Sequence, residues 1–205
     1  MWFLLTLAAI GLITVLSPAE RVLGANARIV YLHGAWVWAS LAGFTAAALV
    51  GLAAWITHRP GLHYWSRALG RTGLFFWITY LPISMWAMQT SWNGLYLAEP
   101  RFRLAVIFSI SGLLLQIGLA LLENPAWASA ANIAYAAALY AALLFLEVAC
   151  AAIVLLEWRS GRVRWPMPVL LGYYLIMHVT AAPIASSKGF QDFSNWVGMA
   201  GRRRN

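Results

Sequence analysis

The chain has 205 residues, of which 62% are hydrophobic and only 10% are charged, and its mean hydropathy is +0.73. This composition excludes a soluble globular domain and predicts an integral membrane protein. In a membrane protein, a net charge of +8 is explained first by membrane topology and by contact with anionic lipid. We do not expect nucleic acid as a partner. A single cysteine, Cys150, excludes an internal disulfide and a cysteine metal cluster.

The apolar runs predict an all-α fold, a bundle of six transmembrane helices forming a single domain over residues 1–205. The first run, residues 1–17, lacks a basic leader region and a small-residue cleavage site, so we expect a retained, short transmembrane helix. The other expected spans are residues 29–57, 72–88, 104–122, an Ala-rich run from the 123–125 turn to about 156, and 168–184.

The connecting segments predict the orientation of the chain. An even number of spans puts both termini on one side, and the loop expected at 58–71 contains Arg59, Arg67 and Arg71 but no acidic residue. By the positive-inside rule this loop and the basic tail 202–204 are cytoplasmic. We therefore predict a multi-pass protein of the bacterial or archaeal cytoplasmic (inner) membrane with both termini cytoplasmic. The arginines that depart from the rule are Arg101, Arg103, Arg159, Arg162 and Arg164.

Small residues recur every four positions in two of the expected helices. The second span contains Ala35, Ala39, Gly43, Ala47 and Gly51, and the fifth contains Ala130, Ala134, Ala138 and Ala142. Because small residues at this spacing let helix backbones approach closely, both stripes are expected to pack against other helices. His33 lies about 160° around the helix from Ala35. It shares a different face with Trp36, Val37 and Ser40.

Residues 89–103 form the most polar and aromatic stretch between two apolar runs. Asn93-Gly94 and Glu99-Pro100 are turn and helix-breaking signals, so this stretch is expected to be a loop. Tryptophan and tyrosine favour the membrane–water interface, where the ring is half buried and its polar group stays hydrated. The loop is therefore either a simple re-entry loop with an aromatic belt or a platform for a flat aromatic ligand.

Polar side chains inside the expected spans are further candidates for chemistry. An ionised Glu147 at bilayer depth costs about 3 kcal/mol on insertion scales, so we expect it to be protonated or paired, with Gln116 as its partner. It is either a packing acid or part of a proton relay. His178 is expected roughly 15 Å down the last span, too deep to share an iron with His33. The two histidines of the 58–71 loop are expected to be solvated.

Two stretches resemble a known family. Residues 17–24, Ser-Pro-Ala-Glu-Arg-Val-Leu-Gly, and 28–36, Arg-Ile-Val-Tyr-Leu-His-Gly-Ala-Trp, are similar to the entry of the second helix in the haem-delivery proteins of bacterial cytochrome c maturation (CcmC-like). Members have six helices, and the resemblance implies that His33 is an axial haem ligand on the outer side. The family's tryptophan-rich, WWD-type haem platform is similar in place to residues 92–101, whose Glu99-Pro100-Arg101 matches its Asp-Pro-Arg ending.

The sequence also departs from the family pattern. Three platform tryptophans correspond here to Leu95, Tyr96 and Ala98, and Gly34 replaces the Val-Pro that follows the histidine. The family's second ligand lies between helices five and six, but residues 157–165 contain no histidine. The resemblance therefore implies a divergent member in which haem is held weakly.

We accordingly predict a haem-handling membrane protein, similar to cytochrome c-type biogenesis proteins and not an enzyme, that binds haem at the outer membrane face. The expected cofactor-binding residues are His33, as the iron ligand, with Trp36, Trp92, Tyr96, Glu99, Arg101 and Arg103, the two arginines pairing with the propionates. The expected partners are membrane lipid, other membrane protein subunits and a haem chaperone or apocytochrome.

Two other functions are consistent with the sequence. The first is a non-catalytic structural subunit of a larger respiratory or photosynthetic complex that has lost haem handling; the small-residue stripes and the reduced aromatic loop favour it. The second is a proton-coupled transporter that uses Glu147, although inverted internal repeats are not visible.

Overall fold

The computed structural model describes residues 2–19 and 23–159, which contain five helices and are all-α, as predicted. The helices are α1 (Trp2–Leu16), α2 (Ala27–Thr57), α3 (Pro60–Trp92), α4 (Pro100–Leu122) and α5 (Pro125–Arg159). Three segments are long and apolar enough to cross a membrane, namely Ala27–Thr57, Pro100–Leu122 and Pro125–Ile153. The expected sixth span, His178 and the basic tail lie outside the described residues, and the six-helix bundle stays a prediction.

The chain divides between residues 31 and 32 into two compact units. In the first, α1 has 15 residues, which corresponds to about 23 Å of helix and is shorter than a bilayer core of about 30 Å. In the same unit Arg28 Nε donates a hydrogen bond of 2.9 Å to the carbonyl oxygen of Ser17. This bond ties the start of α2 to the end of the first apolar run.

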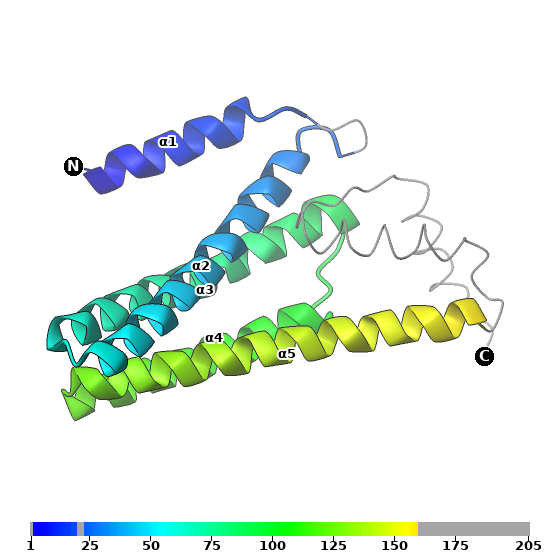
Figure 1. Cartoon of the computed structure of the whole chain (residues 1–205). Coiled ribbons are helices and arrows are strands. Elements are labelled where there is room, and N and C mark those ends of the chain that lie inside the picture. The colour runs from blue at the N-terminus through cyan, green and yellow to red at the C-terminus, as the bar shows by residue number, and fades with distance from the viewer. Residues whose placement is uncertain (1, 20–22, 160–205) are drawn as a thin grey trace. The chain divides into compact units, whose positions relative to one another are not determined.

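The second unit is built from four antiparallel helices, α2 to α5 (Figure 1). Hydrogen bonds between neighbouring helices define how they are aligned. Trp77 Nε1 on α3 donates to the carbonyl of Ala105 on α4 at 3.2 Å, and Tyr135 on α5 donates to the carbonyl of Phe108 on α4 at 2.6 Å. Between them lies a core of Phe44, Leu74, Trp77, Tyr80, Ala105, Ala136 and Leu139.

The small-residue stripe of α2 packs as predicted over its second half. A side-chain Cβ at Gly43 would lie 2.8 Å from the Cα of Gly73 on α3, so these two backbones touch directly. Ala47 and Gly51 are buried, whereas Ala35 is exposed.

The stripe predicted on α5 is not its packing face. Ala134 and Ala138 are exposed, and α5 instead buries Asn132, Ala136 and Leu139. Residues spaced four and then three apart follow one side of a helix, so this second set defines the face turned to the bundle. The Ala spacing alone could not distinguish that face from the neighbouring one.

Two predicted loops are shorter than expected. Residues 58–71 are not a loop, because α3 begins at Pro60, a residue whose fixed φ suits the first helical turn. The chain reverses at His58, which has a φ of 52°, and Arg59.

The expected loop at 89–103 is reduced to residues 93–99. Asn93 ends α3 in the left-handed conformation, with a φ of 55°, and Glu99 caps α4. The turn signals therefore marked the true helix ends, but Arg101 and Arg103 belong to the first turn of α4.

Candidate functional site

His33 and Trp36 both turn toward α3. The His33 ring lies against Tyr80, with centroids 5.4 Å apart and planes inclined by 52°. Trp36 Nε1 donates to the hydroxyl of Thr79 at 3.0 Å, and its ring meets the edge of Phe76 at 5.2 Å. The Nδ1 atom of His33 is buried and has no hydrogen-bond partner among the described residues. Burying such a group without a partner costs about 1–3 kcal/mol, so His33 is incompletely satisfied within the described residues and is a candidate functional residue.

Glu99 brings the end of the 93–99 loop to the same end of the bundle. Its carboxylate accepts a hydrogen bond of 2.6 Å from the backbone N–H of Phe102 and so caps α4. Tyr80, the residue that contacts His33, packs against Trp77 with ring centroids 5.3 Å apart, and the Trp77 indole donates to the carbonyl of Ala105 near the start of α4. The structure therefore places His33, Tyr80 and Glu99 at one end of the four helices.

Trp92 and Tyr96 form a separate pair. Their rings meet edge to face, with centroids 5.6 Å apart and planes inclined by 72°, and the residues are 38% and 53% exposed. Trp92 is three turns beyond Tyr80 on the same helix, or about 18 Å along its axis. The two rings are not coplanar, and this pair is not brought against His33.

Arg101 has a protein partner, contrary to the expected pairing of Glu147 with Gln116. Arg101 Nε lies 3.4 Å from Glu147 Oε1, and Nη2 donates to Oε2 at 3.5 Å. Because α4 and α5 run antiparallel, the first turn of α4 meets the last third of α5 (Figure 1). Glu147 is therefore level with the beginning of α4. Its position within an apolar run had instead suggested the middle of the bundle. Arg103 is exposed.

A buried polar network that the sequence did not predict joins α3 to α5. Asn132 Nδ2 donates to the carbonyl of Ser66 at 2.8 Å and lies 3.1 Å from its hydroxyl, and the Ser66 hydroxyl donates to the carbonyl of Ala47 at 2.8 Å. His63 Nδ1 lies 2.8 Å from the hydroxyl of Ser129. His63 is therefore hydrogen-bonded to α5, not simply solvated as expected. We call Ser66, Asn132, Ser129 and His63 the Asn132 network.

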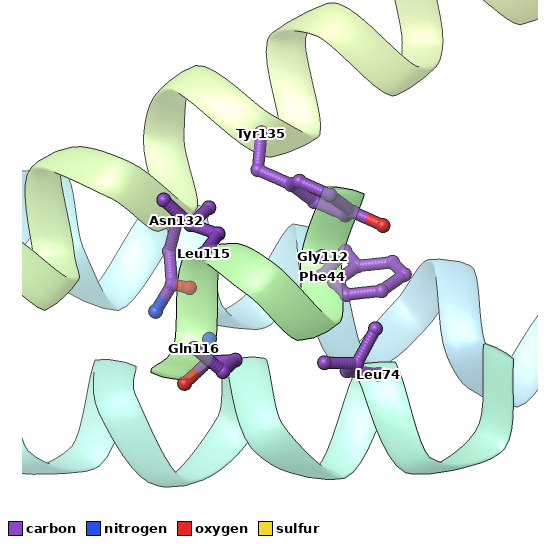
Figure 2. A pocket seen from close by; sticks show the side chains of 7 residues that line it. All are labelled: Phe44, Leu74, Gly112, Leu115, Gln116, Asn132 and Tyr135. Atoms are coloured by element: carbon purple, nitrogen blue, oxygen red, sulfur yellow. The ribbon is translucent and has the colours of Figure 1, made fainter. Parts of the chain in front are cut away.

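A small cavity borders this network. Figure 2 shows Gln116 from α4 and Asn132 from α5 facing the same space, which Phe44, Leu74, Gly112, Leu115 and Tyr135 complete. Its volume is about 10 Å³, close to the minimum that one water molecule needs. Gln116 Oε1 is buried without a hydrogen-bond partner among the described residues. The cavity is far too small for a prosthetic group.

Comparison with protein-family models, with curated proteins and with solved structures finds no match to this chain. Within the described part of the chain, no three His, Cys, Asp or Glu side chains are grouped so that they could hold a metal ion. A functional proposal rests on the residues and contacts described above.

Proposed function

We propose that this chain is a polytopic membrane protein that binds haem at the end of the bundle where His33 lies, with His33 as the iron ligand. The observation that carries this proposal is the buried, unpartnered imidazole nitrogen of His33. A neutral imidazole nitrogen is the commonest protein ligand of metals.

The surrounding residues fit a weakly held haem better than a tightly held one. The exposed Arg103 is available to pair with a propionate, but Trp92 and Tyr96 are not brought against His33 and so do not form a stacking platform for this haem. Arg101 serves a propionate only by exchanging its bond to Glu147. The cavity at Gln116 has room for about one water only, so it takes no part in binding haem.

Exposed tryptophans support a further membrane span in α3, in keeping with the predicted six. Trp38 and Trp55 on α2 are 50% and 48% exposed and lie roughly 26 Å apart along the helix. Trp65 and Trp86 on α3 are 63% and 60% exposed and lie roughly 32 Å apart. Both separations are close to the bilayer core of about 30 Å, and tryptophan favours its two interfaces. We assign the turn at His58 to the cytoplasmic side.

Hemin titration of the purified protein tests this function. In the wild type we expect a Soret band that rises and saturates as hemin is added. In His33→Ala the apparent affinity for hemin should fall by at least tenfold, since the iron loses its protein ligand. His58→Asn is the matched control, because His58 is exposed at the opposite end and asparagine tolerates its left-handed conformation. Equal titrations of His33→Ala and the wild type would contradict haem ligation by His33.

The second candidate is a structural subunit of a larger membrane complex. The bond between Arg101 and Glu147 favours it, because this arginine already has a partner within the chain. Failure of the hemin titration, together with stable co-purification of other membrane subunits, would make this the better account.

A further inference from the structure

The first three turns of α3 carry a concentrated positive charge. Arg59 precedes the helix, Arg67 and Arg71 follow within it, and residues 58–71 contain no acidic side chain. Arg59 and Arg71 are exposed. Nε of Arg67 is buried and has no hydrogen-bond partner among the described residues. The described residues therefore supply no acceptor for this Nε–H group of Arg67.

Arg71 lies on the outward side of α3 and Arg67 at the border of its buried face, because the buried Leu74 is only about 20° around the helix from Arg67. Arg67 and Arg71 are one turn apart, about 40° around the helix, and Tyr64 falls on the same side. Ser66, which is fully buried against the bundle, lies about 140° away from Arg71. Like charges four residues apart on a helix repel each other. An anion placed between the two guanidinium groups would remove this repulsion.

The position of this arginine pair relative to the exposed tryptophans indicates which kind of anion binds there. Trp55, Tyr64 and Trp65 are 48%, 60% and 63% exposed, as expected for side chains at a membrane interface. Arg71 lies roughly 9 Å further along α3 than Trp65, toward the apolar half of the helix. An arginine at that depth extends its side chain back to the interface, where phospholipid phosphates lie.

We propose that Arg67 and Arg71 bind the phosphate of an anionic phospholipid, with Tyr64 against its glycerol and upper acyl region. A guanidinium group matches a phosphate in a bidentate arrangement, and two of them one turn apart bracket a single phosphate. The adjoining exposed ring of Tyr64 favours a lipid over a free anion, because it supplies apolar contact beside the charge. The site deepens the proposed membrane arrangement of α3 and is independent of haem at the opposite end.

Native mass spectrometry of the full-length protein in a mild non-ionic detergent tests the site. With equal amounts of phosphatidylglycerol and phosphatidylcholine added, the wild type is expected to retain phosphatidylglycerol in preference. Loss of each arginine is expected to weaken this preference by about fivefold at a membrane surface. Arg67→Gln/Arg71→Gln should therefore bind the two lipids almost equally. Arg159→Gln, at an exposed arginine in the last turn of α5, is the matched control and should retain the preference.

Three outcomes are decisive. An unchanged preference in Arg67→Gln/Arg71→Gln overturns the site, as does displacement of the lipid by millimolar inorganic phosphate, which would indicate a free-phosphate site. An intermediate preference in Arg67→Lys/Arg71→Lys supports it, because lysine keeps the charge but not the bidentate geometry. Should the double variant fail to fold, Arg71→Gln alone provides the same test, since Arg71 is exposed and a surface substitution has little effect on stability.

Discussion

His33 and His63 are the same residue type at opposite ends of one bundle, and their surroundings differ. His63 is hydrogen-bonded to Ser129 at 2.8 Å and meets the edge of Trp55 at 5.6 Å. His33 packs on Tyr80, yet its Nδ1 is buried without a partner among the described residues. A histidine satisfied by its own protein holds helices together. One left incomplete retains the capacity to bind a ligand, and this difference is the basis for placing the functional site at His33.

The largest effect is expected from tightening the packing of the Asn132 network. A Cβ at Gly70 would overlap the side chain of Asn132, whose bonds to Ser66 leave it little freedom to move. Gly70→Ala should therefore lower stability by about 2–3 kcal/mol, seen as a lower midpoint of thermal unfolding in detergent. Gly118→Ala is the matched control, because a Cβ there meets nothing within 4 Å. An equal stability of the two variants would contradict the role given to this network.

The next largest effect on stability is expected from replacing His63, measured against the same replacement of His33. His63→Ala leaves the buried hydroxyl of Ser129 without its bond and should cost about 1–2 kcal/mol of stability. His33→Ala removes a nitrogen that has no partner to lose among the described residues, so its effect should be clearly smaller. Thermal unfolding of both variants without hemin measures the difference. A larger loss for His33→Ala would show that His33 is the structural histidine.

The smallest effect is expected at the ion pair between α4 and α5. Glu147→Gln removes the charge opposite Arg101 but keeps a hydrogen-bonding side chain, and partly exposed ion pairs contribute only about 0–1 kcal/mol. Folding and hemin binding should both be close to those of the wild type, with Arg101→Gln as the paired variant. Normal folding with complete loss of function in Glu147→Gln would instead support proton transfer through this carboxylate.

The helix ends were predictable where local chemistry decides them. Asn93 and Glu99 mark the ends of α3 and α4 because one adopts the left-handed conformation and the other caps a free N–H group. The start of α3 was mistaken because the arginines after Pro60 suggested a loop. Charge does not prevent a helix: Arg71 occupies an outer position, and Arg67 lies at the border of the buried face.

The side-chain partners were not predictable, because they depend on how helices are aligned with each other. Gln116 and Glu147 both interrupt apolar runs, which suggested a pair. The antiparallel register of α4 and α5 instead brings Glu147 to Arg101 and leaves Gln116 beside Asn132. The same register decides which polar side chains are satisfied. The sequence could identify His33 as a candidate but not its unpartnered nitrogen.

Ligand rescue tests the central claim most directly. In His33→Gly the iron ligand is removed and a space the size of the imidazole ring is left, so hemin binding should fall as in His33→Ala. Addition of free imidazole should then restore the Soret band and its saturation, and should have little effect on His58→Gly. Restoration confined to the His33 variant is the result this account predicts. Full hemin binding by His33→Gly without imidazole would contradict it.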